Sequence, residues 1–325
     1  MSRIFDALQR SESERGGDDA ENLPAGPELL KRAERHASTK WSDTTAVREF
    51  VTAAPTNGDA LHPAGIAIAE VPGASELAQA EAIPEAERVK FFKQVKSLSI
   101  SLASQSRLVC LTDRESPTAE ALRLLGVRLR DLRRLKPLKK VLITSTIPQE
   151  GKSMIAGNLA CTFAHATEER TLLIEGDLRR PSLSAMFGVR PGTGICDCVR
   201  EGGSFQQHIF RLEEPGFWIF PAGNAPSNPL ELLQSPRLPG LMDELAQYFD
   251  WIVIDSPPVL PLADTSVWMR LADGVLLVTR QGTTEKQQLQ KGLEALDQKK
   301  MLGALLNGAV ASAYSGYYYR AASHS

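Results

Sequence analysis

The sequence predicts a doubly wound α/β fold, in which helices cover both faces of a mostly parallel sheet. Two observations support this prediction. Between residues 140 and 308, short apolar runs alternate with longer segments of helical periodicity. The apolar runs are continuous rather than alternating with polar residues, which is typical of strands buried on both faces. Because parallel strands require crossover connections, we expect the intervening helices to join them in the right-handed sense.

The composition is that of an ordinary globular protein. The chain of 325 residues is 42% hydrophobic and 23% charged, and it has room for two domains or for one large domain with tails. Its net charge of −2 gives no reason to expect nucleic acid as a partner. No apolar run approaches the ~20 residues that span a bilayer, and the charged start is unlike a signal peptide. The four cysteines are expected to be reduced thiols of a cytoplasmic protein.

Residues 1–95 differ from the rest of the chain and are expected to form a largely disordered, low-complexity extension. They are rich in Ala, Glu, Gly, Pro and Ser, and their apolar periodicity is weak. Residues 1–10 are the exception, because Ile4, Phe5 and Leu8 fall on one face of a short amphipathic helix. Such a helix could dock on a partner or a membrane surface, or it could be a frayed tail; the sequence leaves these alternatives open.

A folded domain is expected over residues 96–313, with order beginning near Phe91. Residues 107–112 are a candidate extended segment. A helix should then run from Pro117 to about Leu135, because proline suits the first turn of a helix and leucines form an apolar stripe along the segment.

The segment between a strand at 141–143 and the helix that follows has the form of a phosphate-binding loop. Gly-Lys-Ser at 151–153 brings backbone N–H groups and the positive end of a helix next to a lysine. Lys152 would reach the terminal phosphates of a nucleotide, and the Ser153 hydroxyl would bind Mg²⁺. The usual motif has a glycine where this chain has Thr146, so the loop by itself is equally compatible with a surface turn.

Two further strands end in acidic residues. The strand at 171–174 leads into Glu175, Asp177 and Arg179, and the strand at 251–254 ends at Asp255. The remaining strands are expected at 217–220, 274–279 and 301–306, and helices at 238–248, 262–271 and 285–296. Because the carboxyl ends of parallel strands meet at one edge of the sheet, the carboxylates should converge with the loop and form a site for a nucleoside triphosphate and Mg²⁺.

Together these segments resemble the catalytic domain of the bacterial tyrosine kinases (BY-kinases) of capsular and exopolysaccharide assembly, of the CpsD/CapB type. The resemblance covers roughly residues 105–320. It rests on the stretches TSTIPQEGKS, LLIEGDLRRPSL, FPAGNAPSNPLELLQS and WIVIDSPPVLPLADT and on the tyrosine cluster at 314–319. It implies a P-loop NTPase fold and a cytoplasmic, ATP- and Mg²⁺-dependent protein-tyrosine kinase that regulates polysaccharide polymerisation and export.

The resemblance also implies roles for individual residues. The catalytic residues would be Lys152, Glu175, Asp177, Arg179 and Asp255. The nucleotide would contact Pro148, Gln149, Glu150, Gly151, Lys152, Ser153, Met154 and Asn307, and Mg²⁺ would be held by Ser153, Asp177 and Asp255. The phosphate acceptors would be Tyr314, Tyr317, Tyr318 and Tyr319 in a tyrosine-rich tail at 314–325. The tails would be phosphorylated in trans between copies in a homo-oligomeric ring.

A partner is implied as well: a membrane-anchored polysaccharide co-polymerase, or chain-length regulator, acting as activator. A separate polypeptide would supply it, and it would recruit the kinase to the inner face of the cell membrane.

The chain departs from the family pattern at several positions. Glu175 stands where the family has Asp, and its extra methylene would move the carboxylate by over ~1 Å. Gln149 replaces the first glycine of the family's loop and puts a Cβ where the backbone should be bare. In the expected interface helix, Glu120-x-x-Arg123 is followed by Gly126 instead of a second arginine. These departures favour one alternative, a nucleotide-binding scaffold that phosphorylates nothing. The amphipathic helix at 1–10 leaves a second one open, a positioning ATPase with a membrane-binding helix.

Overall fold

The computed structural model describes residues 83–102, 106–166, 169–260 and 262–309. The described residues all belong to one of the two units into which the chain divides. The amphipathic helix predicted at 1–10 and the tail at 314–325 lie outside the described residues.

The predicted α/β fold is confirmed in the described part of the chain. Eight strands form one sheet in the order β1-β4-β5-β3-β6-β2-β7-β8, and every pair is parallel except β4 with β5. The strands are β1 (Lys96–Leu98), β2 (Lys140–Ser145), β3 (Thr171–Glu175), β4 (Phe210–Leu212), β5 (Trp218–Phe220), β6 (Trp251–Asp255), β7 (Gly274–Arg280) and β8 (Met301–Asn307). The central strands β3 and β6 are buried at every position, as continuous apolar runs predict.

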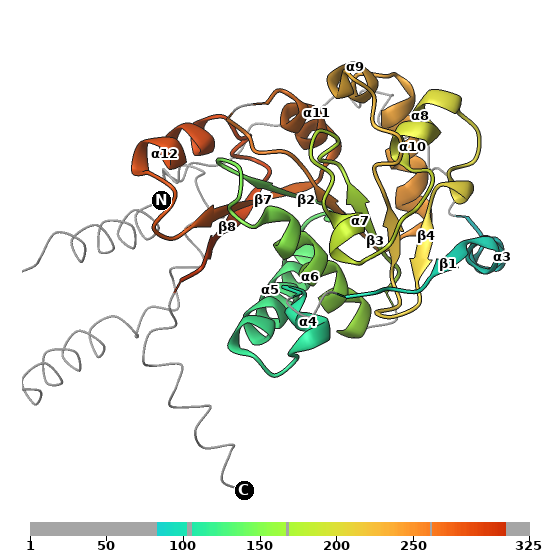
Figure 1. Ribbon diagram of the computed structural model, residues 1–325, viewed down its shortest axis with the longest axis horizontal. Helices are drawn as coiled ribbons and strands as arrows, with labels where there is room; N and C mark the ends of the chain where they lie inside the picture. Colours follow the sequence, from blue (N-terminus) through green and yellow to red (C-terminus); the bar gives the residue numbers. More distant parts are fainter. Residues whose placement is uncertain (1–82, 103–105, 167–168, 261, 310–325) are drawn as a thin grey trace, which may run out of the picture. The chain divides into compact units, whose positions relative to one another are not determined.

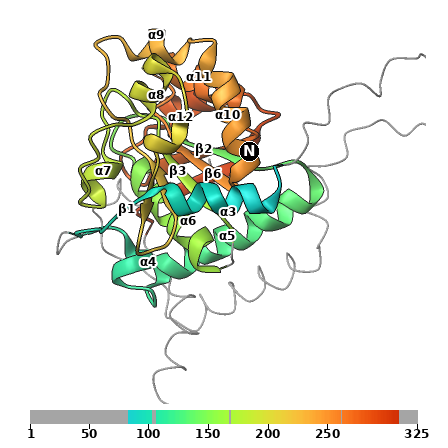
Figure 2. The same cartoon turned by 90° about the vertical axis from the view of Figure 1, so that its right-hand side faces the viewer.

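Helices cover both faces of this sheet. They are α3 (Glu85–Gln94), α4 (Val109–Thr112), α5 (Pro117–Leu135), α6 (Lys152–Ala166), α7 (Leu183–Met186), α8 (Ile195–Glu201), the short 3₁₀ helix η2 (Phe205–Gln207), α9 (Pro229–Leu233), α10 (Arg237–Tyr248), α11 (Asp264–Leu271) and α12 (Lys286–Glu294). Figures 1 and 2 show α4, α5 and α6 on one side of the sheet and α9, α10 and α11 on the other. Each side has its own apolar core, one including Phe163 of α6 and the other Trp268 of α11. The two cores place the sheet between layers of helices, which is the doubly wound arrangement.

The extended segment predicted at 107–112 is wrong, because these residues contain the short helix α4. The backbone N–H groups of Leu111 and Thr112 donate to the Leu108 carbonyl, as a helical turn requires. The N–H of Cys110 is taken by the side chain of Asn158 on α6 at 3.0 Å. The segment therefore satisfies its polar backbone groups against a helix instead of beside a strand.

The packed part of the chain begins before the predicted domain start at residue 96. Helix α3 lies within residues 1–95, yet Phe91 is buried and its ring centroid lies 4.3 Å from that of Tyr248. Arg88 donates to the Tyr248 carbonyl at 2.6 Å. Only one side of this helix contacts the core, so its average hydrophobicity is low. The sequence therefore does not reveal it as part of the packed domain.

No helix among the described residues is both long and apolar enough to cross a membrane.

Candidate functional site

The phosphate loop connects β2 to α6 and depends on one glycine. Gly151 has φ +95°, and a Cβ at this position would overlap the side-chain amide of Asn307. The Asn307 amide donates to the Glu150 carbonyl at 2.8 Å. Only glycine therefore fits between the loop and the end of β8.

Two residues that the resemblance assigns to nucleotide contact hold the loop from beneath. The Glu150 side chain is fully buried; it accepts from the Ile147 N–H at 2.8 Å and from the Thr284 hydroxyl. Asn307 supports the loop through its bond to Glu150. Neither side chain lines the cavity in front of the loop. In this structure both act on the loop backbone.

Gln149 adopts a left-handed backbone conformation. Its φ is +68°, the only positive φ of a non-glycine residue in the described parts of the chain. This is the position where the family pattern has glycine, and the side chain is exposed. The loop thus keeps a shape that favours glycine at a cost of roughly 1–2 kcal/mol.

We expect Gln149→Gly to stabilise the fold by about 1 kcal/mol, because glycine adopts this conformation without steric cost and loses some of the gain to its freer unfolded chain. Thermal denaturation should show a rise of a few degrees. Gln149→Ala is the matched control: it shortens the side chain but keeps the Cβ, so its midpoint should stay close to that of the parent. If the thermal midpoint of Gln149→Gly is no higher than that of Gln149→Ala, the backbone at residue 149 is not strained.

The structure brings together Lys152, Ser153, Asp177 and Asp255. Lys152 Nζ lies 2.8 Å from Asp177 Oδ2 and 3.5 Å from Asp255 Oδ1, and it reaches the Ser153 hydroxyl at 3.2 Å. The acidic residues meet because β3 and β6 are adjacent parallel strands in register, with Glu175 opposite Asp255. Convergence at the carboxyl edge of the sheet is what the order of strand ends predicts.

Burial dominates the electrostatics of this cluster. It raises the pKa of Asp255 from an ordinary 3.8 to about 6, although the nearby Lys152 ammonium works in the opposite direction. The second oxygen of Asp255 is buried and has no hydrogen-bond partner among the described residues. Burial also disfavours the charged form of Lys152, but the carboxylates of Asp255 and Asp177 outweigh it and raise the lysine pKa. Lys152 therefore carries its charge at neutral pH.

Arg179 is paired with an aspartate that sequence reasoning did not single out. Its guanidinium donates through Nε and Nη2 to the two carboxylate oxygens of Asp264, at 2.8 and 3.0 Å. Asp264 is buried in the first turn of α11, and the hydrogen bond to it raises the pKa of Arg179. The pairing is bidentate, a geometry that fixes the orientation of the planar group.

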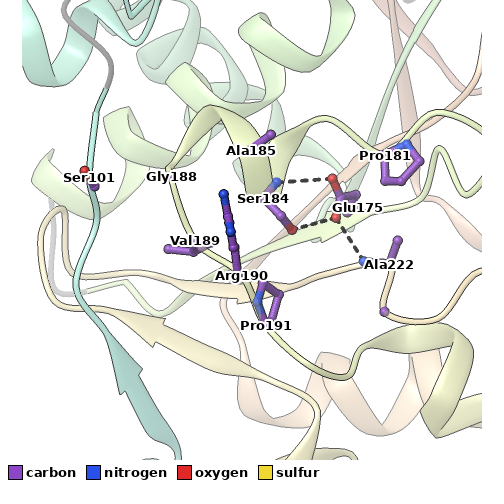
Figure 3. Close-up of a pocket in the computed structure, with 11 residues that line it drawn as sticks. Ser101, Glu175, Pro181, Ser184, Ala185, Gly188, Val189, Arg190, Pro191 and Ala222 are labelled. Atoms are coloured by element: carbon purple, nitrogen blue, oxygen red, sulfur yellow. Dashed lines mark hydrogen bonds between the residues drawn. The ribbon is translucent and has the colours of Figure 1, made fainter.

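Glu175 does not face the phosphate loop, contrary to the sequence-based expectation. Its Oε1 accepts from the N–H groups of Leu183 and Ser184, at 2.7 and 3.2 Å. Its Oε2 accepts from the Ser184 hydroxyl at 2.8 Å and from the Ala222 N–H at 3.0 Å. Figure 3 shows the carboxylate pointing toward α7 and Ala222. The extra methylene of glutamate carries the carboxylate to these donors, so the side chain joins three segments of the fold.

A cavity of about 710 Å³ lies in front of the loop. Lys152, Ser153, Met154, Asp177 and Arg179 line it, together with Pro148, Gln149 and Gly151. Three arginines that sequence reasoning missed line it too, namely Arg107, Arg180 and Arg280. Arg280 follows the last buried residue of β7, and its position at a strand end is the signal that could have found it. The cavity is rich in cations and suits a polyanionic ligand.

The oxygen ligands suit Mg²⁺ better than a transition metal. Nowhere in the described chain do three or more His, Cys, Asp or Glu side chains gather as a metal cluster. Mg²⁺ typically takes one or two carboxylates and completes its shell with phosphates and water. Asp177, the unpartnered oxygen of Asp255 and the Ser153 hydroxyl supply such a partial shell.

Comparison with known proteins assigns the chain to a family. No family model matches it. It is 34% identical over 217 residues to the tyrosine-protein kinase YwqD of Bacillus subtilis, which covers 66% of this chain and 91% of that protein. It is 36% identical over 174 residues to the succinoglycan biosynthesis transport protein ExoP of Rhizobium meliloti, covering 51% of this chain but 22% of that protein.

A solved structure agrees with this assignment. The crystal structure of the chimerical protein CapA2B2 superposes with a TM-score of 0.59 at 27% identity, over 68% of this chain and 97% of the other. With the phosphate loop, the paired aspartates and the sheet order in place, these similarities show that the chain belongs to the bacterial tyrosine-protein kinases.

Proposed function

We propose that this kinase transfers the γ-phosphate of Mg-ATP to tyrosines in the C-terminal tail of another copy of the chain. The observation that carries the proposal is the position of Lys152, at the end of the phosphate loop, between Asp177 and Asp255. A lysine and two carboxylates at that place can bind the two halves of Mg-ATP, the phosphates and the cation.

In this proposal the chain binds and orients the reactants. The Lys152 ammonium leaves the two carboxylates and contacts the β- and γ-phosphates, since phosphate oxygens compete for its N–H donors. Asp177, Asp255 and Ser153 would hold Mg²⁺, which when bound would neutralise charge on the phosphates. The exchange costs little free energy, because each buried carboxylate loses the Lys152 ammonium as its partner and would gain Mg²⁺ instead.

Arg179 neutralises charge on the transferred group. Two of its N–H donors remain on Asp264, which keeps the guanidinium at the cavity wall. Its other N–H groups are available to phosphate oxygens in the transition state. Asp177 lies beside Lys152 and can also orient the hydroxyl of the incoming tyrosine.

The setting of the reaction is part of the proposal. We infer that the kinase acts in polysaccharide assembly as a homo-oligomer at the inner face of the cell membrane, with a membrane-anchored co-polymerase as activator. Support comes from ExoP, a transport protein of succinoglycan biosynthesis, in which the matching segment is under a quarter of the length.

Mass spectrometry of the chain incubated with Mg-ATP tests the acceptor. We expect most phosphotyrosine at Tyr314, Tyr317, Tyr318 and Tyr319, since these cluster beyond the last strand. Tyr248→Phe is the control, because Tyr248 packs against Phe91 on α3 and its loss should leave tail phosphorylation unchanged. Phosphate found mainly on Tyr248 or on serines would contradict the proposal.

A further inference from the structure

A second cavity lies beside the phosphate cavity and is not used by the reaction described above. Its volume is about 550 Å³ (Figure 3). The two cavities share a wall, because Glu175 lines the second and Asp177 the first, while the adjacent residues Pro181 and Ser182 line the second and the first respectively. A ligand in the second cavity would therefore be separated from the phosphate site by only one or two residues of this chain.

The floor of this cavity is rigid and already satisfied. Glu175 is 1% exposed, and its carboxylate accepts four hydrogen bonds from α7 and the Ala222 segment. With these four donors bound, the carboxylate has little acceptor capacity left for a ligand. The floor thus determines the shape of the cavity and contributes little to any preference for the charge of a ligand.

The walls combine apolar surface with one available cation. Pro181, Ala185 and Val189 supply apolar surface. Arg190 projects along the cavity in Figure 3, is exposed, and makes no hydrogen bond or ion pair with any described residue. Apolar walls beside a free guanidinium suit an aromatic ring that carries a hydroxyl, because arginine stacks on the ring face and donates to oxygen.

We infer that this cavity binds a second tyrosine of the acceptor segment while a neighbouring tyrosine occupies the phosphate cavity. The inference rests on the proposed function and adds to it the substrate preference of the kinase. In an extended peptide, residues i and i+2 project to the same side, about 7 Å apart. Because only a short stretch of chain separates the two cavities, an extended peptide that crosses their shared wall would place residues i and i+2 in them.

The tail contains one such pair. Tyr317 and Tyr319 are two residues apart, whereas Gly316 and Arg320 flank Tyr318 at that spacing. Tyr314 has Ser312 and Gly316 at the same spacing. Tyr317 and Tyr319 should therefore be phosphorylated faster than Tyr314 and Tyr318, although all four are close together in the sequence.

The test uses a synthetic peptide of residues 312–323 and the full chain with alanine at its four tail tyrosines, so that its own tail does not compete. In this background Arg190→Ala removes the cation and Ala185→Trp fills the cavity. Each should weaken peptide binding to the Mg-ADP-bound protein about tenfold by calorimetry, the scale of a desolvated cation–π contact. ADP affinity should not change, which also verifies folding. Ala295→Trp, at an exposed position after α12, is the matched control and should bind the peptide like the parent.

The peptide itself supplies the second arm. Tyr319→Ala in the peptide should slow phosphorylation of Tyr317 about tenfold, whereas Tyr314→Ala should not. If the cavity variants and the Tyr319→Ala peptide behave like their parents while the parent peptide is phosphorylated, the second subsite is refuted and the kinase proposal stands. If the parent peptide is not phosphorylated even when the cytoplasmic segment of a candidate co-polymerase is added, the proposed function itself fails.

Discussion

Lys152→Met is expected to abolish nucleotide binding and tail phosphorylation while the sheet stays folded. Methionine retains most of the packing of the lysine stem but removes the only ammonium between Asp177 and Asp255. Phosphates would then lose the ammonium that offsets the two buried carboxylates. We expect ADP affinity to fall at least about 100-fold by calorimetry, the scale of losing hydrogen bonds between charged groups.

The same change should alter how stability depends on pH. The Asp255 pKa of about 6 lies above its ordinary 3.8, so its stabilising contribution is complete below pH 3.8 and is lost as the pH rises through 6. Without Lys152, which lowers this pKa, the pKa should rise further and the loss should extend to higher pH. The gap in melting temperature between parent and Lys152→Met should be wider at pH 8 than at pH 5.

Lys299→Met is the matched control, because Lys299 is exposed and precedes β8, whose opposite end, Asn307, contacts the loop. It should change neither ADP affinity nor the pH profile. Retention of ADP affinity by Lys152→Met would remove the assignment of 146–153 as a phosphate loop, and a gap independent of pH would contradict the account of Asp255.

The strands and the convergence at their ends could be predicted from sequence because one physical constraint determines both. A strand buried on both faces must be continuously apolar, so the polar residue that ends it marks the sheet edge. Asp255 ends β6 and Asp177 lies two residues beyond the end of β3, and both meet Lys152. Gln149 follows a similar local rule, since the family's glycine marked a place where φ is positive.

Side-chain direction and long-range pairing could not be predicted in this way. Glu175 ends a strand as Asp255 does, but its longer side chain finds donors on α7 and the Ala222 segment. Asp264 lies 85 residues from Arg179 along the chain, and nothing local marks it as that partner. Helix α3 contacts the core through few residues, such as Phe91 against Tyr248. Sequence periodicity does not identify such a limited contact.

Substitutions at Glu175 should reduce the stability of the fold. Glu175→Ala removes the acceptor of four hydrogen bonds and leaves three buried or half-buried backbone N–H groups without a partner. We expect a loss on the order of 3–5 kcal/mol, comparable to breaking a buried charged pair, and a melting temperature lower by about 10 °C. Glu175→Asp should be intermediate, because the shorter side chain cannot reach both α7 and Ala222.

Glu175→Gln separates a positioning role from a catalytic one. Its amide oxygen can still accept from Leu183 and Ser184, and its NH₂ can donate to the Ser184 hydroxyl, so only the bond from the Ala222 N–H is lost. That loss should cost about 1–3 kcal/mol, the penalty of one unsatisfied buried donor. An amide cannot exchange a proton at neutral pH, so a catalytic acid–base role would cost ~10²-fold or more in the phosphorylation rate. Because Glu175 faces α7 and not Lys152, we expect the tail phosphorylation rate of Glu175→Gln to lie within a few-fold of the parent rate. The assay temperature should be 20 °C lower than the melting temperature of the variant. A rate lower by ~10²-fold in protein that still binds ADP normally would return Glu175 to the reaction and contradict the positioning role.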